Sequence, residues 1–219
     1  MKTILVIGAG RSAATMIKYL LDNAEDQDWM VHVVDADISS AKEKVNGHKR
    51  AKCFEFDATN KENRLVKIKE ADLVISMLPA NLHLEVVKDC IENKKHIITP
   101  SYISEEVKAL DSQAKEAGIM VLNEMGLDPG IDHMSAMKVI NEISEMGGDI
   151  TGFESFTGGL VAPESDDNPW HYKFTWNPRN VVLAGQGGAA KFIQEGNYKY
   201  IPYNKLFRRT EIIEIDGFG

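Results

Sequence analysis

The sequence has few cysteines, no long apolar run and no extended Lys/Arg stripe. Its two cysteines, Cys53 and Cys90, are too few and too far apart for a disulfide framework or a cysteine-based metal site. No stretch of about 18 apolar residues occurs, so we expect no transmembrane helix. The apolar run at residues 4–7 is too short for a signal peptide. We therefore expect a cytoplasmic protein with reduced thiols.

The charge balance is acidic, with 33 Asp and Glu against 25 Lys and Arg, which gives a formal charge of −8. This balance disfavours nucleic acid or an anionic membrane as the main partner. Hydrophobic residues make up 43% of the chain and charged residues 26%, which is typical of a soluble globular protein. Its 219 residues correspond to one large domain, or to one domain plus part of another.

The first half alternates short apolar runs with segments of helical periodicity. We expect strands at residues 4–7, 31–34, 52–56, 73–76, 97–98 and 119–122. We expect helices at residues 12–23, 38–45, 65–68, 84–91 and 105–117. Such alternation requires right-handed crossovers and a parallel sheet covered on both faces. The sequence therefore predicts an α/β fold with a doubly wound, Rossmann-type parallel sheet.

A boundary is expected where a helix at residues 131–143 ends in Met146-Gly147-Gly148. We assign residues 1–147 to a dinucleotide-binding domain and 148–219 to the start of an α+β substrate and dimerisation domain that is incomplete within this chain. In the second part we expect a strand at 153–157, helical periodicity at 181–193 and short strands between 198 and 215. An exposed sheet edge there would favour a homodimer.

A glycine-rich turn follows the first expected strand and opens the first helix. Gly8 suits the tight turn, Gly10 lets the backbone approach a pyrophosphate, and Ala13 is small enough for close helix–strand packing. Arg11 and Ser12 lie in the first turn of the helix, whose free N–H groups attract anions. This pattern, with a strand before it and a helix after it, predicts a dinucleotide-binding site.

Asp35 stands at the end of the second expected strand, 35 − 10 = 25 residues after Gly10. A carboxylate there accepts hydrogen bonds from the adenosine ribose and repels a 2′-phosphate, which favours NAD over NADP. The alternative is that Asp35 only caps the following turn, although Asp37 is the better candidate for the cap of the next helix.

Ligands of doubly wound sheets bind at the carboxyl ends of the strands. Asp57 and Ala58 follow the third expected strand and are candidates to flank adenine. Met77, Leu78 and Pro79 follow the fourth and are candidates for the nicotinamide side. Ordinary strand-to-helix turns are the alternative explanation for each of these residues.

Four longer motifs resemble the saccharopine dehydrogenases, in particular their saccharopine reductase (L-glutamate-forming) branch. They are residues 72–79 (DLVISMLP), 99–102 (TPSY), 123–134 (NEMGLDPGIDHM) and 158–165 (GGLVAPES). The resemblance covers the chain to about residue 183 and implies an oxidoreductase of lysine metabolism acting on a C–N bond. Saccharopine would lose a hydride to the nicotinamide, and water would then release glutamate and aminoadipate semialdehyde from the imine.

The resemblance also implies roles for individual residues. The cofactor would contact Gly8, Gly10, Arg11, Ser12, Asp35, Asp57, Ala58, Met77, Leu78 and Pro79, together with Leu127 and Trp176. The amino-acid substrate would contact Ser101, Tyr102, Leu127 and Asp128.

The chemistry needs a group that handles the amine proton and the attacking water, and Asp128 and Tyr102 are the catalytic candidates. A capping aspartate and a tyrosine packed on the sheet edge are the structural alternatives. His32, His83 and His96 show no ligand spacing, and we assign them no role.

The sequence departs from the resembled branch at two informative positions. NADP-using members tend to carry a basic residue where Asp35 stands, and Thr157 replaces a frequent cysteine. Two other functions remain open. One is a related reductase that forms secondary amines of the carboxynorspermidine type. The other is an inactive NAD-binding fragment or regulatory module.

Overall fold

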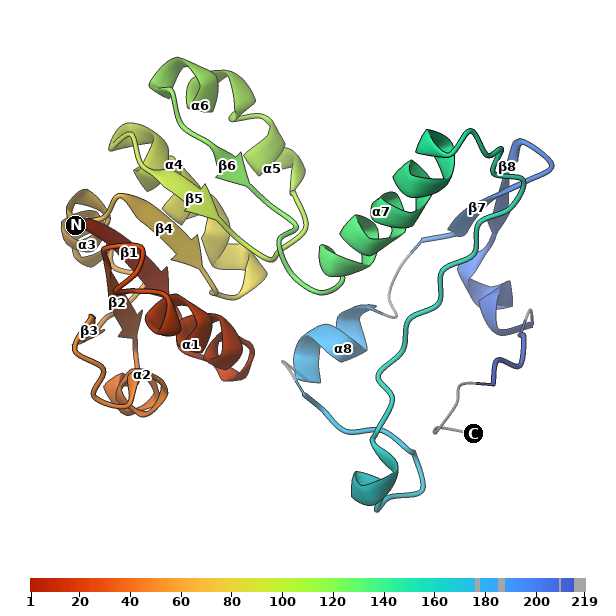
Figure 1. The fold of residues 1–219 in the computed structure, drawn as a ribbon, viewed down its shortest axis with the longest axis horizontal. Coiled ribbons are helices and arrows are strands. Elements are labelled where there is room, and N and C mark those ends of the chain that lie inside the picture. Colours follow the sequence, from red (N-terminus) through yellow and green to blue (C-terminus); the bar gives the residue numbers. More distant parts are fainter. Residues whose placement is uncertain (176–177, 185–187, 209, 215–219) are drawn as a thin grey trace. The chain divides into compact units, whose positions relative to one another are not determined.

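The computed structural model describes residues 1–175, 178–184, 188–208 and 210–214 of the chain. The chain divides into two compact units, residues 1–155 and 156–219. The first unit is built on a six-stranded parallel sheet with the order β3-β2-β1-β4-β5-β6 (Figure 1). The strands are β1 (Lys2–Ile7), β2 (Trp29–Asp35), β3 (Ala51–Glu55), β4 (Leu73–Ser76), β5 (His96–Ile98) and β6 (Val121–Leu122). The predicted Rossmann-type sheet is confirmed.

Helices connect the successive strands of the first unit. They are η1 (Arg11–Ala13), α1 (Ala14–Asp22), α2 (Ile38–Val45), α3 (Lys61–Glu70), η2 (Ala80–Leu82), α4 (His83–Glu92), α5 (Glu105–Lys108) and α6 (Asp111–Ala117), and α7 (Ile131–Glu145) follows β6. Asp37 caps α2 through its side chain, as predicted, by accepting a hydrogen bond from the Ser39 N–H at 2.9 Å. Among the helices described, none has the length and apolar character required to cross a bilayer.

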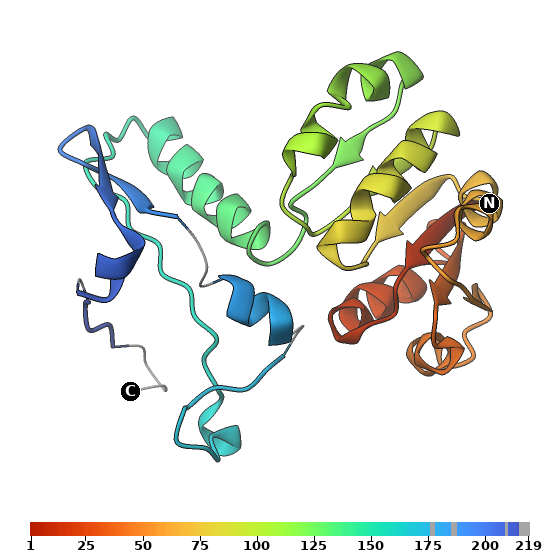
Figure 2. The same ribbon diagram turned by 180° about the vertical axis from the view of Figure 1, so that it is seen from behind.

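The two faces of the sheet carry separate apolar cores, because successive residues of a strand point to opposite faces. Ile4 and Val6 of β1 pack on one face with residues of α1 and α2. Leu5 and Ile7 pack on the other with residues of α3 and α4. Figures 1 and 2 show these helices from the two sides. Burial on both faces explains why the central strands read as continuous apolar runs.

The central switch point of the sheet lies between β1 and β4. From β1 the chain first builds outward through β2 and β3, and it then returns to place β4 on the other side of β1. The connections that follow β1 and β4 run to opposite faces of the sheet, since α1 packs in one core and α4 in the other. Ligands of such folds bind where neighbouring connections diverge in this way.

Two predicted elements of the first unit need correction. The helix expected at 105–117 is two helices, α5 and α6, because Leu110 leaves helical geometry and packs against the apolar core. The strand expected at 119–122 is shorter, since Gly118 ends α6 in a left-handed conformation and the N–H of Ile119 still bonds the carbonyl of Ala114.

The second unit contains η3 (Pro163–Ser165), α8 (Pro178–Ala184), the antiparallel pair β7 (Ala190–Gln194) and β8 (Asn197–Ile201), and η4 (Tyr203–Arg208). The strand predicted at 153–157 is wrong, because this segment has exposed aromatic side chains and no partner strand among the described residues. The helical periodicity at 181–193 is only partly confirmed: α8 ends at Ala184, and β7 begins at Ala190.

The turn at Glu195-Gly196, with both residues at positive φ, closes the β7–β8 hairpin. Of the strands expected between 198 and 215, the structure confirms β8. The chain then forms η4, and residues 210–214 have no regular structure.

Candidate functional site

The glycine-rich turn after β1 lies close to the end of β4. Gly8 has φ +101°, and a Cβ there would lie 2.9 Å from the Met77 carbonyl oxygen, so that only glycine fits. Gly10 is exposed, has ordinary backbone angles and has open space where a Cβ would be. Arg11 and Ser12 begin η1 and are exposed, and the start of η1 has no side-chain cap. The turn therefore presents an open backbone surface and an uncapped helix start, which together suit a pyrophosphate.

Asp35 is the last residue of β2 and reaches back to this turn. Its Oδ2 accepts a hydrogen bond from the Ala9 N–H at 2.6 Å, and its Oδ1 accepts one from the Asp37 N–H at 2.9 Å. These bonds fix the carboxylate beside the glycine-rich turn, while each oxygen keeps a further lone pair. Asp35 is half-buried, and the structure thus places a fixed acceptor where an adenosine ribose binds in such folds.

Asp57 and Ala58 follow β3. The Asp57 Oδ1 accepts hydrogen bonds from the Thr59 N–H at 2.8 Å and from the Thr59 hydroxyl at 2.7 Å, and the hydroxyl bond is the main reason that the Asp57 pKa is lowered. Arg64 donates to the Ala58 carbonyl at 2.8 Å and, through Nε, to the Asp89 carboxylate at 2.6 Å. A buried ion pair therefore holds this loop against α4, a feature that the sequence analysis missed.

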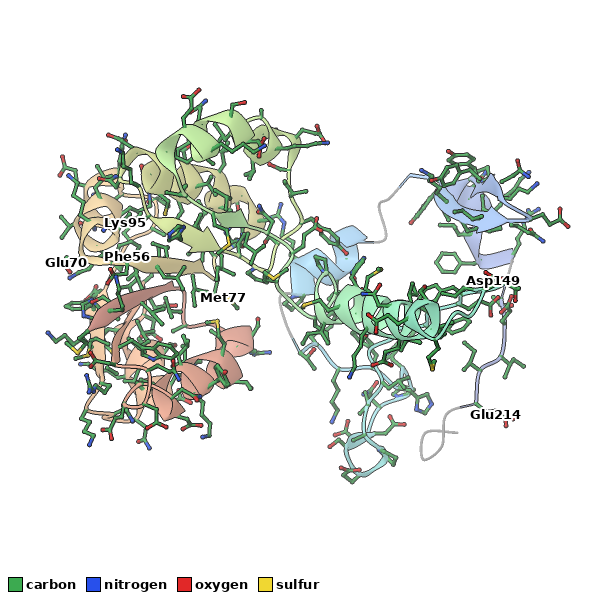
Figure 3. All side chains as sticks on the ribbon, turned by 45° about the horizontal axis from the view of Figure 1, so that its top comes forward. Phe56, Glu70, Met77, Lys95, Asp149 and Glu214 are labelled. Carbon is green, nitrogen blue, oxygen red and sulfur yellow. The ribbon has the colours of Figure 1, made fainter. Side chains whose placement is uncertain are left out.

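Met77, Leu78 and Pro79 follow β4, opposite the glycine-rich turn. The Met77 N–H bonds the Ile7 carbonyl at 2.8 Å, which keeps the two loops in register. Met77 and Leu78 are half-buried and Pro79 is exposed. In Figure 3, Met77 lies at the opposite end of the sheet from Glu70 and Lys95, which precede β4 and β5. This loop is therefore part of the carboxyl edge.

The loops after β5 and β6 are joined by hydrogen bonds. The Glu124 N–H bonds the Ser101 carbonyl at 3.0 Å, and the Glu124 Oε1 accepts from the Ile103 N–H at 3.2 Å. Between these contacts the Tyr102 hydroxyl donates to Asp128 Oδ1 at 3.3 Å. Burial, followed by the negative charge of Asp128, raises the Tyr102 pKa. The two catalytic candidates from separate loops are therefore in contact and exposed, as a proton-handling pair requires.

The segment from Gly126 to Gly130 projects Leu127 and Asp128 outward. The Gly126 N–H bonds the Pro129 carbonyl at 2.8 Å, and the Ile131 N–H bonds the Gly126 carbonyl at 3.0 Å. A Cβ on Gly130, whose φ is +148°, would meet the Gly126 oxygen at 2.1 Å, so this turn requires glycine. The residue at the cap position of α7 is Gly130, and Asp132 accepts from its N–H at 2.9 Å. Asp128 is therefore not the cap of this helix.

A buried polar cluster behind these loops was not predicted. His83 begins α4, and its ring lies 2.9 Å from the Ser76 hydroxyl at Nδ1 and 2.8 Å from the Ser101 hydroxyl at Nε2. The Thr99 hydroxyl lies 3.3 Å from both ring nitrogens. Burial lowers the His83 pKa to about 4, so the ring is neutral near pH 7. The signal in the sequence was three hydroxyl residues at the ends of two neighbouring apolar strands.

The carboxyl edge of the first unit thus carries nearly all the predicted site residues. After β1 stand Gly8, Gly10, Arg11 and Ser12; after β2, β3 and β4 stand Asp35, Asp57, Ala58, Met77, Leu78 and Pro79; and after β5 and β6 stand Ser101, Tyr102, Leu127 and Asp128. Trp176 lies outside the described residues. Among the described members of this set, the Tyr102 hydroxyl bonds Asp128, and Gly8 lies close to the Met77 carbonyl.

Two family models match this chain. The model described as the saccharopine dehydrogenase NADP binding domain matches residues 4–122, and the one described as the saccharopine dehydrogenase C-terminal domain matches residues 126–218. The chain belongs to the saccharopine dehydrogenase family. The resemblance seen in the four sequence motifs is confirmed.

Relatives within this family support the assignment. The chain is 41% identical to the saccharopine dehydrogenase [NADP(+), L-glutamate-forming] of Pyricularia oryzae over 89% of its length, which is 42% of that protein. It is 38% identical to the alpha-aminoadipic semialdehyde synthase of Arabidopsis thaliana over 93% of its length, but covers 21% of that protein. A solved structure of apo saccharopine dehydrogenase (L-Glu forming) from Saccharomyces cerevisiae matches 98% of this chain and 47% of its own, with 36% identity and a TM-score of 0.82. The chain spans less than half the length of these relatives.

The carboxyl edge fits the dinucleotide that the family binds. The close approach at Gly8, the open space at Gly10 and the fixed Asp35 acceptor are the features that a pyrophosphate and a ribose require. The family model and the Pyricularia relative are named for NADP, whereas Asp35 is the residue from which the sequence predicts NAD.

Proposed function

We propose that this saccharopine dehydrogenase family member is an oxidoreductase that oxidises the secondary amine of saccharopine to give glutamate and aminoadipate semialdehyde. The observation that carries the proposal is the contact between Tyr102 and Asp128 at the edge that bears the glycine-rich turn. The names of the relatives support the reaction. In this proposal the chain holds nucleotide on the β1–β4 side of the sheet and substrate beside β5 and β6.

In this reaction the proposed role of Asp128 and Tyr102 is proton transfer to and from the substrate. A secondary amine that is protonated in water cannot release a hydride, so a base must first take its proton. Asp128 is exposed and keeps lone pairs free beside the Tyr102 hydroxyl, which makes it the proposed base. Tyr102 holds its own proton, because its pKa is raised, and it orients the Asp128 carboxylate. When bound, the nicotinamide dinucleotide supplies the hydride acceptor. Because Asp128 is exposed, it can pass the amine proton to solvent and then accept a proton from the water that attacks the imine.

We also propose that this chain prefers NAD, unlike the relatives named for NADP(+). Asp35 is fixed by two backbone N–H groups, so it cannot easily turn away from a ribose 2′-phosphate. A carboxylate and a phosphate a few ångströms apart repel each other by several kcal/mol at the effective dielectric of a protein surface, roughly 4 kcal/mol for unit charges at 4 Å. A 2′-hydroxyl can instead donate a hydrogen bond to the same carboxylate.

A cytoplasmic homodimer completes the proposal. Cys53 and Cys90 are free thiols, which is consistent with a reducing compartment. The β7–β8 pair is a two-stranded sheet, and such a pair is only marginally stable alone. Pairing with a second copy would cover its open edges.

The test is oxidation of saccharopine by the purified chain with NAD⁺ or NADP⁺, followed at 340 nm and by the release of glutamate. We expect formation of reduced nucleotide and glutamate in equal amounts. Binding of nucleotide without turnover of saccharopine would refute the proposed reaction. Turnover of a carboxynorspermidine-type amine alone would assign the alternative substrate.

A further inference from the structure

The His83 cluster connects two loops that the proposed function assigns to different ligands. Ser76 ends β4, directly before the loop at Met77, Leu78 and Pro79. Ser101 lies in the loop after β5, directly before Tyr102. The imidazole lies between the two hydroxyls, with Nδ1 2.9 Å from Ser76 and Nε2 2.8 Å from Ser101.

The burial of this cluster sets it apart from an ordinary surface contact. His83 is 4% exposed, and Ser76 and Thr99 are fully buried. Ser101 is half-buried, so it forms the outer end of the cluster beside the exposed Tyr102. A buried polar group is costly unless it is hydrogen-bonded, and here every ring nitrogen has a partner.

The neutral His83 ring can couple the orientation of the Ser76 hydroxyl to that of the Ser101 hydroxyl. A neutral imidazole has one N–H donor and one acceptor nitrogen, so the two hydroxyls cannot both donate to it or both accept from it. The direction of the Ser76 hydroxyl therefore fixes the direction of the Ser101 hydroxyl. The Thr99 hydroxyl also holds this loop, since it accepts a hydrogen bond from the Ser101 N–H at 3.3 Å.

We propose that His83 is a positioning residue that holds the substrate-side loop at Ser101 and Tyr102 in fixed relation to the cofactor-side loop that follows Ser76. This inference rests on the proposed function, because the roles of the two loops come from it. His83 acts through Ser101 and does not touch the reacting atoms. Its effect is on the distance and angle at which hydride donor and acceptor meet, to which reaction rates are sensitive.

Two substitutions of His83 separate its two contacts. His83→Asn places an amide near the position of Nδ1, where it can reach Ser76, and leaves Ser101 without a partner. His83→Gln places an amide near the position of Nε2, where it can reach Ser101. Both variants remove the ring from the same buried position, so they share the cost of losing its packing.

We expect His83→Asn to lower kcat by about tenfold or more and to raise the primary deuterium isotope effect on hydride transfer, as misplacement of a reacting group does. We expect His83→Gln to stay within about threefold of the wild type in kcat, since it keeps the contact that positions the loop. Ser101→Ala should reproduce the His83→Asn defect, and the two changes together should cost little more than either alone. An equal loss in the Asn and Gln variants, with an unchanged isotope effect, would overturn the proposal.

A second readout does not depend on turnover. Amide hydrogen exchange by NMR reports protection at residues 101–103, and we expect lower protection in His83→Asn than in His83→Gln. Equal protection in the two variants would overturn the positioning role, whatever the wild-type activity. Failure of the wild type to oxidise saccharopine, with the Asn and Gln variants still differing in protection, would refute the proposed function and leave the role of His83 in holding the loop intact.

Discussion

The carboxylate of Asp35 accepts a hydrogen bond from the backbone N–H of Ala9 at 2.6 Å. This bond joins the end of β2 to the glycine-rich turn after β1, the two segments that would hold the ribose and the pyrophosphate of a dinucleotide. A carboxylate in this position shapes the turn, and in our proposal it also selects the nucleotide.

Removing this charge should change the preference between nucleotides. We expect Asp35→Asn to lower the ratio of the NADPH Kd to the NADH Kd by at least about tenfold, because the loss of even about 1.4 kcal/mol of charge repulsion corresponds to a factor of ten. Asp37→Asn is the matched control, since it removes a charge two residues away and keeps an oxygen to cap α2. Fluorescence titration measures both ratios. An unchanged ratio in Asp35→Asn would exclude Asp35 as the selecting residue.

The two glycines of the turn should respond differently to alanine. Gly8→Ala places a Cβ 2.9 Å from the Met77 oxygen at φ +101°, and we expect it to lower the free energy of unfolding by about 1–3 kcal/mol. Gly10→Ala meets no atom and should leave stability within about 0.5 kcal/mol of the wild type. It should still weaken nucleotide binding, because its methyl group stands where the pyrophosphate approaches. Urea unfolding and nucleotide titration of both variants test this division, and tight nucleotide binding by Gly10→Ala would contradict it.

Asp128→Asn should abolish proton transfer without affecting the fold. Its side chain is exposed, so we expect the free energy of unfolding to change by less than about 0.5 kcal/mol. We expect kcat for saccharopine to fall by about 10²–10⁴-fold, the range for loss of a general base, with an unchanged nucleotide Kd. Tyr102→Phe, which removes the hydroxyl 3.3 Å from Asp128, should cause a smaller loss. Parallel losses of activity and nucleotide affinity in Asp128→Asn would mark it as a structural residue.

The buried ion pair of Arg64 and Asp89 should dominate the stability of the loop after β3. Their side chains are 5% and 3% exposed. Asp89→Asn leaves a buried guanidinium without its counter-charge, and we expect a loss of about 3–5 kcal/mol in the free energy of unfolding. Replacing both residues, as in Arg64→Met with Asp89→Leu, should restore much of this loss. A double variant as unstable as the sum of the single variants would contradict the assignment.

Burial of His83 should make the protein less stable in mild acid. The His83 pKa is about 4 in the folded chain and near 6.5 when unfolded, so the unfolded chain binds the proton first as the pH falls. Stability is therefore full above pH 6.5 and is lost between pH 6.5 and 4, with about 2 kcal/mol lost from this residue by pH 5. Urea unfolding at pH 7.5 and 5.0 should therefore show a loss that is larger by about 2 kcal/mol in the wild type than in His83→Gln. An equal loss in the two proteins would contradict this assignment.

The sequence could predict the sheet because its central strands are buried on both faces. Residues 4–7 are a continuous aliphatic run, and residues 31–34 are three valines interrupted by His32. Such runs are typical of strands that are buried on both faces. Residues 153–157 are a short segment with Phe153 and Phe156 among polar residues, a pattern that does not require burial on two faces of a sheet. This segment has no strand partner among the described residues. The helix break at Leu110 follows from packing of its side chain on the core, which periodicity does not report.

The site residues also fall into those that the sequence could predict and those that it could not. Asp35 and Asp128 could be predicted, because Asp35 ends β2, Asp128 lies in the loop after β6, and the carboxyl ends of parallel strands share one edge. His83 could not, since its partners Ser76, Thr99 and Ser101 come together only when β4 and β5 pair and α4 packs behind them. The Arg64–Asp89 pair was missed for the same reason, as it joins two helices.

The central claim is that the carboxyl edge of the first unit binds a nicotinamide dinucleotide at the glycine-rich turn. Titration of the purified 219-residue chain with NADH and with NADPH, followed by nucleotide fluorescence, tests it most directly. We predict saturable binding at one site, tighter for NADH and weakened by Gly10→Ala. Failure of a folded chain to bind either nucleotide, with circular dichroism confirming its helices and strands, would contradict the claim.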